Sequence, residues 1–269
     1  MGNGWASSRD VHMGRLLQVV EESLAVTHLA ELDLKLADPE WSALRTHQWM
    51  HDNHFDAAPL DEPEPHRVVV AGTLRPNSRP VREQAGPIDS TLLVSADLSL
   101  ADGIARLASR PFYFVLQRDQ LRGIVTRADL QRPAVAMILF SMILASESAM
   151  SVVIDRRLGD AWIEQLRAAD RESVDQIFKA RVRTNTEVTR LECLMLNQRL
   201  DLLAACPGAL ADLGFSSRKD FKKWKERLRG LRDTLAHGGG LLHAEPDPLH
   251  AIGLFEAVRS FADRVWGVV

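Results

Sequence analysis

The chain has few cysteines, and they form no known redox or metal-binding motif. Cys193 and Cys206 are the only two among 269 residues, and they show no Cys-x-x-Cys spacing. This argues against a disulfide framework and against a zinc site. A reducing, cytoplasmic location is therefore expected.

A charge excess of one sign is also missing. The chain has 33 Lys and Arg residues against 36 Asp and Glu residues, which gives a net charge of -3. A balance this close to zero provides no general attraction to nucleic acid or to an anionic membrane. Binding to either must come from a local patch.

Long hydrophobic runs and a targeting segment are missing as well. The longest apolar run, Ala134 to Ala145, is well short of the roughly 20 residues that cross a bilayer, so we predict a buried helix and no membrane partner. The segment Met1 to Ala6 has neither a basic start nor an apolar stretch. An untargeted N-terminal tail is expected.

The chain contains enough apolar residues for two compact domains. Its apolar fraction is 46% and its charged fraction 26%, both ordinary for globular proteins. Domains usually have about 100–150 residues, so 269 residues suggest two of them. The sequence predicts an α+β fold with a tail and the start of a first helix over 1–19, a paired α/β module over 20–133, and a helical bundle over 134–269.

In the first half, one order of elements occurs twice. Helical spacing of apolar residues predicts a helix from Leu16 to Leu36, before the repeats. Each repeat then contains a helix and two strands, the second repeat covering about 87–133. The expected elements are a helix at Trp41–Met50, strands at Phe55–Leu60 and Arg67–Leu74, a strand at Leu92–Val94, a helix at Ser99–Ser109 capped by Asp97 or Ser99, and strands at Tyr113–Leu116 and Leu121–Thr126.

After Pro133 the strand signals stop, and amphipathic helices are expected to the end of the chain. Asp247 before Pro248 is typical of a helix start. These features predict an all-α bundle of four to five helices. The expected helices are Ala134–Ile154, Asp160–Arg181, Thr186–Ala205, Ser217–His237 and Pro248–Trp266.

The segment Gly123 to Leu130 resembles the end of a CBS repeat, in which a Gly, two apolar residues, a Ser or Thr, two variable residues and an Asp close the fold. Arg110 to Leu116 resembles the middle strand of that family. The resemblance implies a regulatory site for an adenosine nucleotide at Thr126 and Asp129, with Arg127 and Tyr113 beside it. Alternatively, Thr126 and Asp129 only cap a helix.

The first repeat lacks the polar pair of the second. Val70 stands where Thr126 would be, and Thr73 stands where Asp129 would be. The resemblance therefore predicts a Bateman-type CBS pair with a degenerate first repeat and at most one ordinary nucleotide site. CBS pairs commonly associate face to face, so a homodimer is expected.

Near the C-terminus, Arg232-Asp233-Thr234-Leu235-Ala236-His237-Gly238 resembles the Arg-x4-His signature of HEPN domains. The resemblance implies metal-independent RNA cleavage at a site where two copies of the motif face one another. Arg232 would hold the phosphate, His237 would carry a proton, and Asp233 would orient one of them. On a helix Arg232 and His237 are about 140° apart, and Gly238 to Gly240 should end the helix directly after His237, where the helix dipole favours a protonated imidazole. The structural alternative is that Arg232 pairs with a carboxylate and His237 caps the helix.

Basic residues precede this motif and form the expected local patch for RNA. They could equally form an ordinary solvated face. His243 and His250 are interpreted as surface loop residues, and no metal site is predicted. The predicted RNA-binding residues are Lys219, Lys222, Lys223, Lys225 and Arg229.

Together these patterns favour a nucleotide-regulated HEPN endoribonuclease that needs no cofactor for catalysis. A toxin or stress-response RNase, with or without a neutralising protein partner, would suit this design. One alternative is a non-catalytic nucleotide-sensing scaffold in which both halves only bind and dimerise. Another is a HEPN domain that transfers nucleotides to a partner protein.

Overall fold

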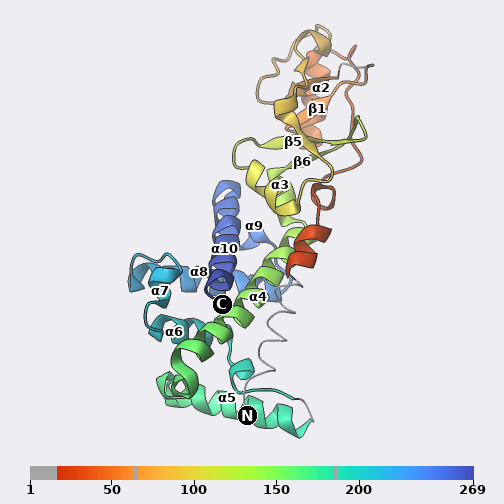
Figure 1. The fold of residues 1–269 in the computed structure, drawn as a ribbon. Coiled ribbons are helices and arrows are strands. Elements are labelled where there is room, and N and C mark those ends of the chain that lie inside the picture. Colours follow the sequence, from red (N-terminus) through yellow and green to blue (C-terminus); the bar gives the residue numbers. More distant parts are fainter. Residues whose placement is uncertain (1–16, 64–65, 185–186) are drawn as a thin grey trace. The chain divides into compact units, whose positions relative to one another are not determined.

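The computed structural model describes residues 17–63, 66–184 and 187–269. It divides into two compact units. One is Leu24–Leu130, which contains all the strands of the described residues; the other is mainly helical and combines Gln131–Val269 with residues 17–23 (Figure 1). The chain is thus α+β, with small N-terminal sheets followed by a mainly helical C-terminal region.

The second repeat forms the more regular sheet. Strand β4 (Leu93–Ser95) runs parallel to β5 (Phe112–Gln117), and β5 pairs antiparallel with β6 (Gln120–Thr126). Helix α3 (Leu100–Arg106) connects β4 to β5, and the Ser99 side chain caps it by accepting a hydrogen bond from the Asp102 N–H at 3.1 Å. The expected helix and strands are confirmed here, with Ser99 as the cap.

The first repeat has the same order with shorter strands. Helix α2 (Ala43–Asp52) precedes β1 (Ala57–Pro59), which pairs antiparallel with β2 (Arg67–Val70). Before the helix, Ala37 forms a parallel bridge to Leu60, as β4 does to β5. A short strand β3 (Gly86–Pro87) pairs with the other edge of β2. The internal repeat is therefore visible in the backbone pairing.

The helix predicted over Leu16–Leu36 is wrong beyond Ser23. Residues 17–23 are helical, but Glu31 then forms an antiparallel bridge with Ile124. This bridge brings the chain so close to β6 that a Cβ on Gly123 would lie 2.4 Å from the Glu31 carbonyl oxygen. Backbone pairing with a strand edge replaces the helical hydrogen bonds, and it leaves Leu32 and Leu36 exposed.

The helical unit is arranged around α4 (Pro133–Leu158), which packs against α10 (Pro248–Val268) and α6 (Leu196–Ala205). Helix α10 begins as predicted, because the Asp247 side chain accepts from the His250 N–H at 2.8 Å. The remaining helices of this unit are α5 (Ala168–Arg183), α7 (Ala209–Asp212), α8 (Arg218–Ala236) and α9 (Leu241–Ala244).

Two predicted helices are broken in the structure. The segment expected as Asp160–Arg181 begins as the 3-10 turn η5 (Gly159–Gln165), and α5 follows it. In the segment expected as Thr186–Ala205, Thr186 lies outside the described residues, and α6 starts only at Leu196. The buried Arg199 of α6 donates to the carbonyls of Leu191 and Leu194, which lie just before this helix, and so satisfies backbone groups that an unbroken helix would have bonded itself. Further 3-10 turns are η1 (Val26–His28), η2 (Val81–Glu83), η3 (Ser90–Leu92), η4 (Arg127–Gln131) and η6 (Leu191–Cys193).

The helical stretch Pro133–Gln165 is long and apolar enough, by length and composition alone, to cross a membrane. Core helices of globular proteins can also meet this test, and 56% of its most apolar window is buried inside the protein. The residues of the predicted apolar run that face the core are Val135, Ile138, Leu139, Met142, Ile143 and Ala145.

Candidate functional site

The end of α8 is fixed by a glycine cap. Gly238 has a φ of +80°, its N–H donates to the Leu235 carbonyl at 3.1 Å, and the Gly239 N–H donates to the Thr234 carbonyl at 2.9 Å. These two bonds are those of a Schellman motif, which favours glycine at the left-handed position. The helix thus ends at His237 and the chain turns back immediately, as the glycine run predicted.

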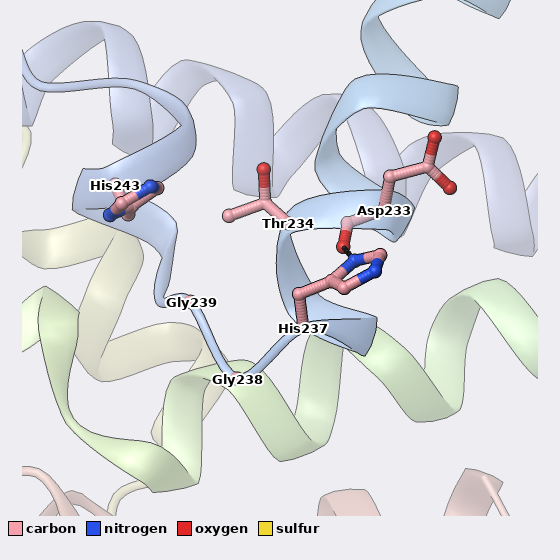
Figure 2. A pocket seen from close by; sticks show the side chains of 6 residues that line it. All are labelled: Asp233, Thr234, His237, Gly238, Gly239 and His243. Atoms are coloured by element: carbon pink, nitrogen blue, oxygen red, sulfur yellow. Dashed lines mark hydrogen bonds between the residues drawn. The ribbon is translucent and has the colours of Figure 1, made fainter.

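The His237 imidazole lies at this helix end and is exposed (Figure 2). Its Nδ1 is 2.7 Å from the backbone carbonyl oxygen of Asp233. A carbonyl can only accept, so Nδ1 carries the hydrogen and donates. Proton exchange with a ligand then belongs to Nε2, the ring nitrogen that is a base when His237 is neutral and an acid when it is charged.

A solvent-open pocket of about 440 Å³ adjoins His237. The chain that follows the glycine turn forms α9 and brings His243 into the lining of the same pocket, on the other side of Thr234 from His237 (Figure 2). The sequence interpretation of His243 as a surface loop residue missed this role. A histidine on each side of a triglycine turn was the available signal. The lining residues are Asp233, Thr234, His237, Gly238, Gly239 and His243.

Arg232 and Asp233 form a contact at the edge of this pocket. Arg232 Nη1 is 3.4 Å from Asp233 Oδ1, and the two side chains are 39% and 54% exposed. The Asp233 side chain lines the pocket, whereas Arg232 is not among the lining residues. Exposed pairs of this kind contribute little to stability, so a ligand can replace one partner of the pair at a small cost in free energy.

Behind Arg232 lies a buried ion pair. Arg199 Nη1 is 3.2 Å from Glu147 Oε2, and the side chains are 9% and 17% exposed. Burial raises the pKa of Glu147, while the positive charges of Arg199 and Arg232 act in the opposite direction. The Arg199 Nε also donates to Ser151 Oγ at 2.9 Å. This network attaches α6 to α4 beside the position of Arg232.

The predicted RNA patch is not uniform along α8. Lys219, Lys222 and Lys223 are exposed. Lys225 is instead 16% exposed, and its Nζ is 2.5 Å from Asp201 on α6, because it lies on the side of α8 that packs against that helix. Arg229 Nη2 is 3.1 Å from Glu226 in an exposed pair. Of the predicted patch, the three lysines at the start of α8 are thus exposed, and RNA binding by them stays a prediction.

The expected nucleotide residues at the end of β6 bond to one another. The Asp129 carboxylate accepts from the Thr126 N–H at 2.7 Å and from the Thr126 hydroxyl at 2.9 Å. This is the local capping alternative that the sequence left open. A ribose at this position would have to replace these hydrogen bonds.

Tyr113 and Arg127 cap the end of α3. The Tyr113 hydroxyl, on a side chain that is almost fully buried, donates to the Arg106 carbonyl at 3.1 Å. The Arg127 Nε donates to the Leu107 carbonyl at 2.8 Å. Both side chains satisfy carbonyls at a helix C-terminus. Nucleotide binding by these four residues stays a prediction.

A second hollow, of about 340 Å³, lies elsewhere in the sheet unit. It contains two carboxylates, Glu31 and Asp33, against one lysine, Lys35. An acidic lining of this kind repels the phosphates of a nucleotide. Among residues 17–63, 66–184 and 187–269, no cluster of three or more His, Cys, Asp or Glu side chains could hold a metal ion.

Solved structures that are similar to the chain exist, but no protein family matches it. No curated protein matches the chain either. Solved structures that resemble it include an uncharacterized conserved protein from Pyrococcus horikoshii, 12% identical, with a TM-score of 0.36 and coverage of 40% of this chain and 90% of that one. A conserved CBS domain protein of unknown function from Thermoplasma acidophilum is 18% identical, with a TM-score of 0.35 and coverage of 44% and 75%.

A hexameric CBS-CP12 protein from bloom-forming cyanobacteria is 12% identical to the chain, with a TM-score of 0.32 and coverage of 79% of this chain and 98% of that one. The chain is thus similar in structure to CBS-domain proteins. The likeness to HEPN domains stays a prediction from the sequence.

Proposed function

We propose that the helical unit is a metal-independent endoribonuclease whose site is the pocket at the end of α8. The proposal depends mainly on one observation: His237 is exposed beside an open pocket, with Nδ1 held by a backbone carbonyl and Nε2 left to exchange protons. The likeness of Arg232 to Gly238 to the HEPN signature supports the same assignment.

The proposed reaction is an internal transesterification of RNA. The 2′-oxygen attacks the adjacent phosphorus, its proton passes to a base, and the bond from phosphorus to the 5′-oxygen breaks as an acid protonates that oxygen. The products are a 2′,3′-cyclic phosphate and a 5′-hydroxyl. Atoms and charge balance without a water molecule or a redox partner, and His237 carries one of the two protons.

Arg232 is proposed to neutralise the phosphate in the transition state. Its guanidinium pairs with an exposed carboxylate, Asp233, and can exchange that partner for a phosphate at small cost, while its charge also acts on the buried Glu147. Asp233 is then a positioning residue for Arg232. The exposed lysines of α8, Lys219, Lys222 and Lys223, supply attraction to the RNA backbone with little sequence preference.

A homodimer regulated by an adenine nucleotide is the proposed setting for this site. Two copies of the motif facing each other would enclose one RNA strand, and a nucleotide bound to the sheet unit would change access to it. A toxin or stress-response role with a neutralising partner fits such control. These parts of the proposal rest on the resemblances described from the sequence.

The test compares purified wild-type chain with His237→Ala on single-stranded RNA in the presence of EDTA. Loss of the proton carrier is expected to lower the cleavage rate by about 10³-fold, at an unchanged unfolding temperature. His250→Ala is the matched control, because His250 is an exposed histidine that does not line the pocket.

Cleavage by wild type but not by His237→Ala, with cyclic-phosphate products, would support the proposal. Equal rates for the two, or products with a 3′-hydroxyl, would contradict it. If neither degrades any RNA, the chain is a binding protein, and the non-catalytic scaffold becomes the better interpretation.

A further inference from the structure

We infer that His243 is the second proton carrier of this pocket, so that a single chain contains both the acid and the base for RNA cleavage. This inference rests on the proposed function. Cleavage needs one group that accepts the 2′-hydroxyl proton and one that donates a proton to the 5′-oxygen. The HEPN resemblance implies a histidine from each of two chains, whereas the structure brings two histidines of one chain to one pocket.

The two histidines reach the pocket from different elements. His237 caps the C-terminus of α8, and His243 lies in α9, after the triglycine turn. Figure 2 shows Thr234 between them, with both rings at the pocket. The pocket volume of about 440 Å³ falls within the usual range for pockets that bind small ligands.

The position of His243 is fixed by packing around Gly239. A Cβ on Gly239 would lie 3.5 Å from the His243 ring carbon Cδ2 and 2.6 Å from the Thr234 methyl carbon. The turn thus passes closely between the two side chains. Leu241, at the start of α9, is fully buried and anchors this short helix. The His243 ring itself stays exposed to solvent.

Charged side chains lie near both histidines in the sequence. Asp233 and Arg232 lie on the His237 side. On the other side, Arg227 Nη2 is 4.0 Å from Glu245 Oε2, an ion pair that connects α8 to the residue following α9. The contact of the His237 ring is to a backbone carbonyl through Nδ1, which leaves Nε2 as the nitrogen that would exchange a proton with RNA.

The first experiment measures RNA cleavage by His243→Ala and His243→Gln beside His237→Ala and the control His250→Ala. Each of the first three variants is expected to lose about 10²- to 10⁴-fold in rate. Binding of an RNA with a 2′-deoxy sugar at the cleavage site should stay unchanged, because that RNA cannot react. Weaker binding in proportion to the lost rate would mean that His243 only holds RNA, which would overturn the inference.

A second substrate distinguishes the acid from the base. An RNA with sulfur in place of the bridging 5′-oxygen has a leaving group that departs without protonation. Of the two histidine variants, one should regain cleavage on this substrate and the other should not. Rescue of both variants, or of neither, would contradict a division of roles between them.

Mixing His237→Ala with His243→Ala tests whether the pair belongs to one chain. If each site uses both histidines of one chain, the mixture stays inactive. If a dimer combines His237 of one chain with His243 of its partner, random mixing restores about a quarter of wild-type activity. Restored activity would therefore overturn the single-chain site.

The two levels of the proposal can fail separately. If His237→Ala loses activity and His243→Ala does not, only the present inference is wrong. If the wild type does not cleave RNA, the proposed function and this inference both fall. Equal unfolding temperatures for all variants are required in each comparison, and His243→Gln provides the second substitution if His243→Ala unfolds.

Discussion

The end of β6 and the end of α8 were both predicted as binding sites, and they differ in what their polar groups do. At β6, the Asp129 carboxylate accepts two hydrogen bonds from Thr126, so the groups expected to bind a ribose bond to each other. At α8, one nitrogen of His237 bonds a carbonyl, and the other lies beside an open pocket. A motif identifies polar groups, but only their hydrogen bonds show which of them can reach a ligand.

The largest effect is expected from substitution of Arg232 at the end of α8. Arg232→Ala should lower RNA cleavage about 10³-fold, equivalent to ~4 kcal/mol of transition-state stabilisation. The variant lacks the guanidinium that would neutralise the phosphate. Arg232→Lys should retain part of the activity, since it keeps the charge without the two-pronged geometry. Cleavage rates and thermal unfolding measure both. A drop in stability without a drop in rate would assign Arg232 to structure.

Substitution at the end of β6 should lower the stability of the fold, in contrast to the effect on cleavage rate expected at the end of α8. Asp129→Ala removes two hydrogen bonds to Thr126 and should lower the free energy of unfolding by about 1–2 kcal/mol. Chemical denaturation measures this, with Asp97→Ala, at an exposed aspartate of the same unit, as the control. If ATP or AMP protects the wild type against unfolding but not Asp129→Ala, the carboxylate binds a nucleotide after all.

The smallest effect concerns the N-terminal end of α8. Hydrogen bonds from the Ser216 and Ser217 hydroxyls hold the pKa of Asp220 below its usual value. A carboxyl with a lowered folded-state pKa adds stability above its usual pKa, and that stability is lost as the pH falls through the lowered value. Asp220→Asn should therefore destabilise the chain slightly at neutral pH and less in acid. Denaturation midpoints at both pH values would show this, and parallel pH profiles would contradict it.

The strands and most of the helices could be predicted because local signals agreed with the tertiary contacts. The Ser99 and Asp247 caps and the glycine stop after His237 all lie where the sequence placed them. The helix expected over Leu16–Leu36 failed because its periodic apolar residues say nothing about a strand edge that is distant in sequence. Long-range pairing, such as that between Glu31 and Ile124, has no local signature.

The candidate site was predicted only in part, because a local motif identifies some of its residues and tertiary packing places the others. Arg232 and His237 belong to one motif and could be identified together from the sequence. The role of Lys225 could not, because its ion pair with Asp201 depends on how α8 packs against α6. His243 was missed because only the fold of the triglycine turn places it beside Thr234.

Every residue that lines the pocket comes from one unbroken stretch, 233–243. All of these residues belong to the helical unit, and the sheet unit supplies none of them. The pocket should therefore persist while the sheet unit is unfolded or replaced. Regulation by the sheet unit, as proposed above, would therefore change access to the pocket and not its lining.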